Sequence, residues 1–233
     1  MRLDKFISQV TDHSRKDVKK LLKDGVVTID GKPVFDPSLH IAPTHVVRLG
    51  DQLLAEAKPR YFMLNKPKGY VCASKDSDHQ IVLDLLDEAN KDKLQIAGRL
   101  DIDTTGLVLI TDDGQWNHAI TSPRRACNKH YYVCTADAIA PETKAKFAKG
   151  VLLDGEKKPT KPAILDLLFA NEAHLTISEG RYHQVKRMFA AVGNRVVELH
   201  REQIGDITLD PDLAEGEYRP LREDEINSVY RQK

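Results

Sequence analysis

The sequence is poor in cysteine and contains no long apolar run. Only three of its 233 residues are cysteines (Cys72, Cys127 and Cys134), and no two of them form a CxxC pair. This disfavours a disulfide framework or a zinc site. No stretch approaches the roughly 18 apolar residues of a membrane-spanning helix, and residues 1–5 do not begin a signal peptide. We therefore expect a reduced, cytoplasmic protein with no membrane partner.

Common nucleotide, zinc and hydrolase motifs are also missing. The chain has no P-loop, no GxGxxG before a helix, no HExxH and no GxSxG. These absences disfavour NTP hydrolysis, dinucleotide-dependent redox chemistry, zinc-dependent proteolysis and serine hydrolysis of the α/β-hydrolase type. There is no internal repeat and no low-complexity tract.

The charges sum to zero but are unevenly distributed. The chain has 35 basic and 35 acidic side chains. Residues 1–24 contain seven basic and four acidic groups, residues 181–201 contain five and one, and residues 202–233 contain four and nine. Local patches set the field that a polyanion meets within a Debye length of about 8–10 Å. The two basic segments are therefore candidates for binding a polyanion, although each is also compatible with a solvated helix face.

The first 50 residues predict a small module of two helices and a hairpin. Apolar residues at helical spacing predict a first helix near residues 3–10. Ser14 with Asp17 three positions later predicts the start of a second helix with a capping box. The remaining predicted elements of the module are a strand at 26–29, a turn at Asp30-Gly31 and a strand at 46–49.

Residues 50–59 are interpreted as a linker to a second, larger domain. The hydrophobic content of 41% is sufficient for a real core. Because the expected strands and helices do not alternate regularly, a mixed α+β fold is favoured over a doubly wound parallel sheet. The expected strands lie at residues 61–64, 106–111, 131–135, 163–169, 174–178 and 195–200, and the expected helices at 81–86, 115–120, 141–149, 181–192 and 223–230.

The polar loop at residues 98–106 is the first candidate for catalysis. Asp101 follows Arg99 by two positions on a loop bounded by glycines, and an apolar strand follows. Such a loop can hold a reacting carboxylate exposed yet fixed. A loop aspartate is more often a turn former or a helix cap. Asp101 and Asp103 are also compatible with an acid pair of the glycosidase kind.

Residues 178–189 form a second candidate segment. An apolar stripe leaves Arg181, Lys186 and Arg187 on other faces of the expected helix. A cation near the start of this helix can neutralise a catalytic carboxylate or bind a phosphate, and a solvated basic face is the simpler alternative. His183 has no second metal ligand four residues later, so a metal site is not expected.

Two further segments leave alternatives open. In Lys129-His130-Tyr131-Tyr132-Val133 a tyrosine beside cations can stack on a nucleobase, although tyrosines at the start of a strand more often belong to the core. Asp112-Asp113-Gly114 is most simply a turn after a strand. Together with Asp101 and Asp103, these aspartates leave a metal-dependent nuclease or hydrolase as an alternative.

Taken together, four ordered segments resemble one family. The run GRLD at residues 98–101 with TGL at 105–107 is similar to the catalytic-loop signature of the bacterial pseudouridine synthases. LNKPKG at residues 64–69 resembles the motif that opens their catalytic domain, and EGRYHQVKRM at residues 179–188 resembles their third motif. The N-terminal module resembles an S4-type RNA-binding domain. The resemblance covers essentially the whole chain and is strongest to family members that modify small-subunit ribosomal RNA.

The resemblance implies an α+β chain of two domains. A small S4-like α/β RNA-binding domain with its linker is expected at residues 1–58. A mixed, largely antiparallel-sheet pseudouridine synthase domain with a central cleft is expected at residues 59–233.

The resemblance also implies the roles of site residues. Asp101 is implied as the essential catalytic aspartate, Arg99 as a contact to the flipped nucleotide or its phosphate, and Lys186 as the cation paired with Asp101. The spacing Lys-x-Tyr-x-Val points to Tyr131 rather than Tyr132 as the aromatic contact of the base. Relatives often have arginine where this chain has Lys186, so a bidentate fork becomes a point charge. The expected RNA contacts are Arg2, Lys5, Arg15, Lys16, Lys19, Lys20, Arg181 and Arg187.

The implied activity is the isomerisation of a specific uridine in small-subunit (16S) ribosomal RNA. This reaction needs no cofactor, no metal and no energy source, because one glycosidic bond replaces another without redox change. The expected partner is 16S ribosomal RNA or a small-subunit assembly intermediate, and the chain is expected to act as a monomer. Two alternatives remain: a synthase for large-subunit (23S) ribosomal RNA, and a non-enzymatic RNA-binding factor of ribosome assembly.

Overall fold

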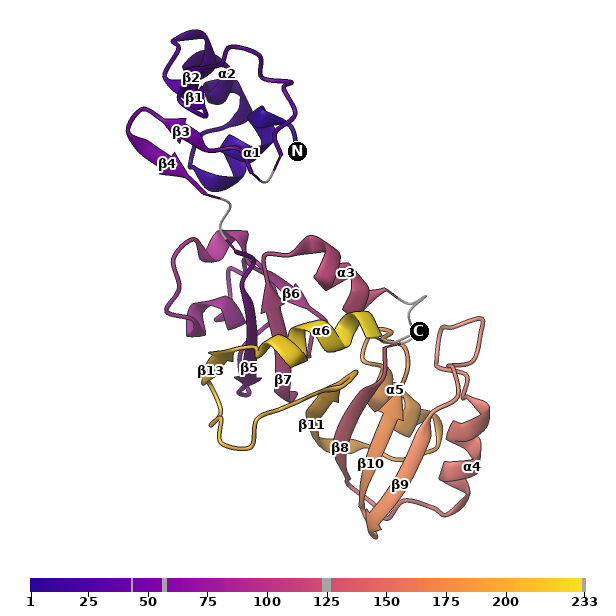
Figure 1. Cartoon of the computed structure of the whole chain (residues 1–233). Coiled ribbons are helices and arrows are strands. Elements are labelled where there is room, and N and C mark those ends of the chain that lie inside the picture. Colours follow the sequence, from indigo (N-terminus) through magenta and orange to yellow (C-terminus); the bar gives the residue numbers. More distant parts are fainter. Residues whose placement is uncertain (43, 56–57, 123–126, 232–233) are drawn as a thin grey trace. The chain divides into compact units, whose positions relative to one another are not determined.

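The computed structural model divides into two units, Met1–Lys58 and Pro59–Lys233, each with its own apolar core (Figure 1). The structure describes residues 1–42, 44–55, 58–122 and 127–231. Among these residues no helix is both long and apolar enough to cross a membrane. The two units are described separately below.

The N-terminal unit packs two helices on a four-stranded antiparallel sheet of order β2-β1-β3-β4. The expected capping box is present, because Ser14 Oγ accepts from Asp17 N at 3.3 Å and Asp17 Oδ2 accepts from Ser14 N at 3.1 Å. Leu3 and Val18 are fully buried in the core of this unit. The elements are α1 (Leu3–Val10), α2 (Arg15–Lys23), β1 (Val27–Ile29), β2 (Lys32–Pro33), β3 (Val47–Leu49) and β4 (Gln52–Leu54).

The N-terminal unit contains the expected hairpin turn, but the expected linker is partly a strand. Asp30 and Gly31 have φ values of 50° and 77°, as the expected tight hairpin turn requires. The interpretation of residues 50–59 as a linker is wrong in part, because β4 pairs with β3 and buries Leu54 in the core. Residues 56–57 of that segment lie outside the described residues.

The second unit is built on a mixed, mostly antiparallel sheet of nine strands, so the expected α+β fold class is confirmed. The main path of the sheet runs β13-β5-β7-β11-β8-β10-β9, with β6 paired to β7 and β12 to β11. Among the paired strands of the residues that the structure describes, only β7 and β11 run parallel to each other. The strands are β5 (Tyr61–Lys66), β6 (Gln95–Ala97), β7 (Thr105–Thr111), β8 (Lys129–Thr135), β9 (Ile164–Phe169), β10 (Glu172–Ile177), β11 (Val196–Ile204), β12 (Ile207–Thr208) and β13 (Tyr218–Pro220).

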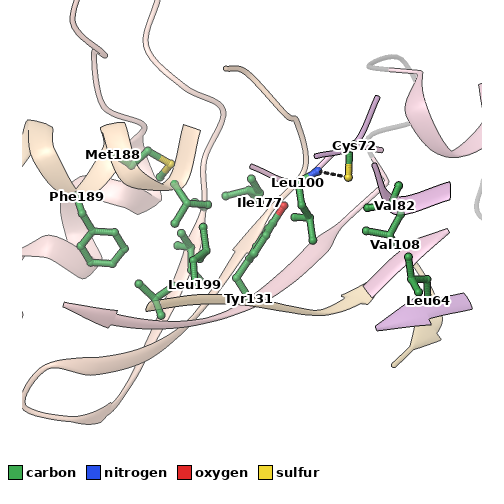
Figure 2. Packing of buried hydrophobic residues seen from close by; sticks show 14 of the residues in the cluster. Leu64, Cys72, Val82, Leu100, Val108, Tyr131, Ile177, Met188, Phe189 and Leu199 are labelled. Carbon is green, nitrogen blue, oxygen red and sulfur yellow. Dashed lines mark hydrogen bonds between the residues drawn. The ribbon is translucent and has the colours of Figure 1, made fainter. Parts of the chain in front are cut away.

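Strand β7 is buried on both faces and separates two cores. Alternate side chains of a strand point to opposite faces. Leu107 and Leu109 therefore join a cluster with Trp116, while Val108 and Ile110 join the larger cluster shown in Figure 2. Helices α3 (Gly114–Thr121) and α6 (Glu223–Arg231) supply the first cluster, and α4 (Glu142–Lys149) and α5 (Gln184–Ala191) the second. Short 3-10 helices, η1 (Val82–Leu85) and η2 (Lys91–Lys93), complete the unit.

The parallel pairing of β7 with β11 requires a glycine at position 106. Gly106 has a φ of +100° and lies opposite Arg201 in the ladder. A Cβ atom at this position would lie 2.3 Å from the backbone oxygen of Arg201, a distance that real contacts do not reach. Since the clash is with backbone, a rotamer change cannot relieve it.

We therefore expect Gly106→Ala to lower the free energy of unfolding of the second unit by about 2–4 kcal/mol. Trp116 is the single tryptophan of the chain and is buried in this unit, so its fluorescence during urea unfolding reports on this unit. Gly114→Ala is the matched control, because nothing lies within 4 Å of the added Cβ and its φ is ordinary. The free energy of unfolding of this control should stay within about 1 kcal/mol of that of the unchanged protein. Equal stability of the two variants would contradict the account of this contact.

Candidate active site

Asp101 lies on the loop of residues 98–104 that joins β6 to β7, beside the start of α5. Its carboxylate is about one-quarter exposed. Lys186 Nζ lies 3.3 Å from Asp101 Oδ2, and His183 Nε2 lies 3.4 Å from Asp101 Oδ1. The structure thus brings together Asp101 and the Lys186 cation that the resemblance implied, although 85 residues separate them in the sequence. A partly exposed carboxylate beside an ammonium and an imidazole is placed to act as a nucleophile or a base.

The backbone before α5 places the His183 ring. His183 has φ 46° and ψ 36°, a left-handed conformation that a non-glycine residue rarely adopts. The helix therefore begins at Gln184, and the expected start at residue 181 is wrong. The preceding turn is closed by the Arg181 backbone N–H, which donates to Gln184 Oε1 at 2.8 Å. Left-handed residues of this kind are concentrated at functional sites.

Lys186 contacts a second carboxylate on the same loop. Its ammonium donates to Asp103 Oδ1 at 2.5 Å. Burial acts to raise the pKa of Asp103, but the hydrogen bond and the charge of Lys186 outweigh burial and hold that pKa below its ordinary value. Asp103 is much more exposed than Asp101, at 63% against 27%. The two carboxylates therefore share one cation while only one of them is partly enclosed.

Tyr131 lies on β8 and is buried, whereas Tyr132 faces the other side of the sheet. The cross-strand neighbours of Tyr131 are Leu175 and Arg201. Figure 2 shows its ring within the apolar cluster and its hydroxyl directed toward Leu100, the residue before Asp101. The Tyr132 hydroxyl instead donates to Glu172 at 2.7 Å. Of the two tyrosines, Tyr131 is the one that lines the cavity beside Asp101.

The cavity beside Asp101 has a volume of about 590 Å³. This volume lies within the range of about 300–1,000 Å³ that is typical of ligand sites. Its walls come from the Asp101 loop, from β8 and from the segment that precedes α5. The expected site residues Arg99, Asp101, Tyr131, Arg181 and Lys186 all line it. This arrangement can enclose one flipped base between the Tyr131 ring and the Asp101 carboxyl group.

Two buried cations hold the Asp101 loop by its backbone carbonyls, and neither was among the expected site residues. Lys66 and Arg201 are 0% and 1% exposed. Lys66 Nζ donates to the carbonyls of Thr104 (2.7 Å), Pro67 (3.0 Å) and Ile102 (3.2 Å). The Arg201 guanidinium donates to the carbonyls of Leu107 (2.8 Å), Gly98 (2.9 Å) and Arg99 (3.3 Å). We call these two side chains and their six carbonyl partners the carbonyl clamp.

The carbonyl clamp also affects the charge of the site. Burial lowers the pKa of the Lys66 ammonium, and the negative charges of Asp101 and Asp103 act in the opposite direction. Lys66 is therefore electrostatically coupled to both loop carboxylates. The sequence marks Lys66 as a candidate, since it stands in the LNKPKG motif at residues 64–69. No sequence pattern, however, distinguishes a buried lysine from an exposed one.

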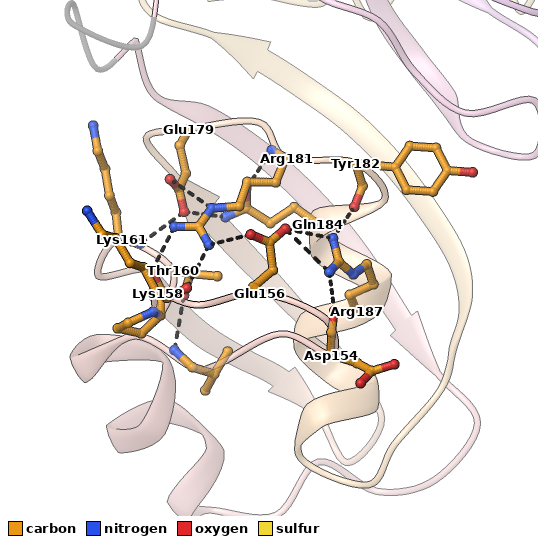
Figure 3. Close-up of polar contacts among 12 residues, drawn as sticks. Asp154, Glu156, Lys158, Thr160, Lys161, Glu179, Arg181, Tyr182, Gln184 and Arg187 are labelled. Carbon is orange, nitrogen blue, oxygen red and sulfur yellow. Dashed lines mark hydrogen bonds and ion pairs between the residues drawn. The ribbon is translucent and has the colours of Figure 1, made fainter.

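Arg181 and Arg187 have internal partners, as Figure 3 shows. Arg181 donates to the carbonyls of Lys158 (2.9 Å) and Pro159 (2.7 Å). Arg187 donates to the carbonyl of Asp154 (2.6 Å), and both guanidiniums lie beside the Glu156 carboxylate. These contacts tie the loop of residues 154–160 to the start of α5. An RNA contact by either arginine remains a prediction, and it would have to share a guanidinium already bound within the chain.

The other basic residues expected to contact RNA are more accessible. Arg2 forms a two-bond pair with Asp4, whose side chain is almost fully buried. Arg99 is exposed, and within the described part of the chain its guanidinium makes no hydrogen bond or ion pair. Among the other residues of the N-terminal unit that are expected to contact RNA, Lys5, Arg15, Lys16, Lys19 and Lys20 are all exposed.

The aspartates of the metal-dependent alternative have structural roles. Asp112 accepts from Arg60 Nε at 2.8 Å and from the Arg60 backbone at 2.7 Å. Asp113 caps α3 and accepts from the Tyr61 hydroxyl at 2.8 Å. In the part of the chain that the structure describes, no three His, Cys, Asp or Glu groups lie close enough to hold a metal ion. The metal-dependent alternative therefore has no ligand set in the described residues.

Comparison with known families agrees with the motifs. A family model described as RNA pseudouridylate synthase matches residues 60–191, and one described as S4 domain matches residues 1–47. These matches confirm the family resemblance of both parts of the chain.

Individual proteins match over the full length. The ribosomal small subunit pseudouridine synthase A of Escherichia coli (strain K12) is 58% identical over 230 residues, covering 98% of this chain and 100% of that protein. The protein of the same name from Haemophilus influenzae is 50% identical over 232 residues, covering 99% and 100%. A solved structure described as a crystal structure of pseudouridylate synthase matches with a TM-score of 0.72 at 50% identity, covering 98% of this chain and 99% of that one. The similarity therefore extends over both units.

Proposed function

The chain belongs to the RNA pseudouridylate synthase family, and we propose that it converts one uridine of small-subunit (16S) ribosomal RNA to pseudouridine. The observation that carries the proposal is the Asp101 carboxylate, paired with Lys186 and His183 at the wall of a cavity that Tyr131 also lines. The choice of RNA is supported by full-length relatives named for the small ribosomal subunit.

The two units have separate tasks in this proposal. Residues 1–58 form the RNA-binding domain and residues 59–233 the catalytic domain. The S4 match and the exposed basic face of α2 support the first assignment, and the location of the Asp101 site supports the second. We infer that the enzyme acts as a monomer, in the cytoplasm and on the 16S RNA or on an assembling small subunit; all of its proposed catalytic residues come from one chain, so the site needs no second copy.

The reaction breaks the N1–C1′ bond of uridine, turns the uracil and forms a C5–C1′ bond. The proton on C5 leaves and N1 gains one, so the product is an isomer of the substrate and no redox partner takes part. Asp101 acts either as a nucleophile on the sugar or ring, or as a base on the adjacent sugar hydrogen. The Lys186 ammonium stabilises its negative charge in both cases, and the His183 ring lies on its other oxygen.

Tyr131 and Arg99 position the nucleotide around that carboxylate. The buried Tyr131 ring offers a fixed face against which the uracil turns, and its hydroxyl lies on the Leu100 side of the cavity. The Arg99 guanidinium, exposed at the cavity wall, binds the phosphate of the flipped nucleotide. Flipping costs a few kcal/mol of stacking and pairing. Phosphate contacts from Lys5, Arg2 and the basic face of α2 offset this cost.

We expect Asp101→Asn to abolish isomerisation while RNA binding is largely retained, because the amide keeps the shape of the carboxylate but not its charge. Tritium release from transcribed small-subunit RNA labelled at uracil C5 measures the reaction. Asp103→Asn is the matched control. It removes a carboxylate that contacts the same lysine but is mostly exposed, and we expect it to lose less than about tenfold in rate.

Near-normal release by Asp101→Asn would overturn the assignment of the catalytic residue. Pseudouridine found only in large-subunit RNA, or in neither RNA, would favour the 23S enzyme or the non-enzymatic assembly factor instead.

We expect simultaneous reversal of Arg15, Lys16 and Lys19 to glutamate to weaken RNA binding and flatten its dependence on salt. Each lost phosphate contact reduces the slope of log affinity against log salt by about 0.7–0.9. Filter binding between about 50 and 200 mM salt measures that slope. The slope of the corresponding triple glutamine variant should lie between those of the unchanged protein and the glutamate variant. An unchanged slope in the glutamate variant would show that the face of α2 does not contact RNA.

A further inference from the structure

Asp101 lines two cavities, and the proposed reaction uses only one of them. The first, of about 590 Å³, is the one that Tyr131 lines and is called the target cavity. The second, of about 880 Å³, is also lined by Asp101 but not by Tyr131, and is called the flanking cavity. The lining residues common to both include Arg99, Tyr182, His183 and Lys186. If the target uridine occupies the target cavity, an adjoining part of the same RNA lies at the flanking cavity.

The groups that line the flanking cavity fit a nucleobase better than a phosphate. Asp76, Asp101 and Asp103 give it three carboxylates against the cations Arg99 and Lys186. This balance disfavours an additional anion. Ser74 and Gln95 add neutral polar groups that can contact a base edge. Gln95 Oε1 already accepts from Asn117 Nδ2 at 3.0 Å, which leaves the Gln95 amide nitrogen as a donor.

Tyr182 presents an unused aromatic face at the rim of both cavities. The residue is 72% exposed, which is high for a large aromatic residue. One face stacks on the His183 ring, with the ring centroids 3.8 Å apart and an interplanar angle of 21°. Within the described part of the chain, its hydroxyl has no hydrogen-bond partner. Neither core packing nor a polar contact therefore accounts for this tyrosine.

The backbone that carries Tyr182 is nevertheless held firmly. Its carbonyl accepts from Arg187 Nη1 at 3.0 Å. The preceding residue, Arg181, is tied to the carbonyls of Lys158 and Pro159. Figure 3 shows the Tyr182 ring pointing away from this network, which contains the two arginines and Glu156. An exposed ring on a fixed backbone loses little conformational entropy when it binds a partner.

We propose that Tyr182 is a stacking platform for the nucleobase next to the target uridine, and that this base enters the flanking cavity. The proposal rests on the function proposed above. Flipping the uridine removes the stacking partner of its neighbour, and the free face of Tyr182 replaces that partner. The platform lies next to His183, which contacts Asp101, so the flanking base is bound at a fixed distance from the reacting carboxylate. Tyr182 thereby acts as a residue that binds the RNA next to the target uridine rather than as a catalytic one.

We expect Tyr182→Ala to raise KM for transcribed small-subunit RNA by about 5- to 150-fold, the range that base–aromatic stacking supplies. Its kcat should change by less than about threefold, because the stack is present in both the ground state and the transition state. Tyr182→Phe retains the ring and should stay within about twofold of the unchanged enzyme in both constants. Phe169→Ala removes an equally exposed ring, 70% exposed on β9, and should have no effect. Unchanged KM in Tyr182→Ala would overturn the platform.

A second measurement identifies the base. A fragment of small-subunit RNA that contains the converted uridine is prepared with an abasic nucleotide at each neighbouring position in turn, and its Kd is measured by filter binding. The unchanged enzyme should bind one of these abasic fragments more weakly than it binds the intact fragment. Tyr182→Ala should bind that abasic fragment and the intact fragment with the same Kd. Equal losses for both proteins at every position would overturn the platform. Absence of tritium release by the unchanged enzyme would overturn the proposed function and the platform with it, whereas normal release with an unchanged KM in Tyr182→Ala overturns the platform alone.

Discussion

The carbonyl clamp is the interaction on which the rest of the site depends. Lys66 and Arg201 are both buried. Arg201 donates to three main-chain carbonyls within residues 98–107, and Lys66 donates to two there and to that of Pro67. A buried cation is costly unless its donors are satisfied, and here backbone oxygens satisfy them. The clamp therefore specifies one conformation of a polar loop that has no regular secondary structure. With Leu100 buried in the core, Asp101 is left at the cavity wall, facing Lys186 and His183.

Much of the fold was predictable because its signals are local. The capping box at Ser14 and the apolar run of β7 depend on residues close in sequence, and both predictions are confirmed. The errors lie where a distant contact overrides the local pattern. Strand β4 has three residues and forms only because β3 offers a partner, so the local pattern predicts a linker there instead. Helix α5 begins three residues after the start that the sequence predicts, because His183 adopts a left-handed conformation that its residue type does not indicate.

The candidate site was predictable in part, and for a similar reason. The family resemblance implies roles for Asp101, Tyr131 and Lys186, and the structure brings these three residues to one cavity. A sequence does not show which charges become buried. Arg201 therefore counts toward the basic segment of residues 181–201 in the sequence, although its side chain is buried. Arg181 was expected to be free for RNA, although the loop of residues 154–160 supplies partners for it.

The most direct test of this account is the single-turnover rate of uridine conversion by Arg201→Lys, measured with enzyme in excess over transcribed small-subunit RNA. Lysine retains the charge but cannot reach the three carbonyls that the guanidinium fork contacts. The account predicts a rate reduced by roughly 100-fold, as expected for a displacement of about 1 Å at the reacting group, with Kd for RNA within about twofold of the unchanged enzyme. The exposed Arg195→Lys, on the same segment, should change neither quantity. An unchanged rate in Arg201→Lys would contradict the claim that the carbonyl clamp positions Asp101.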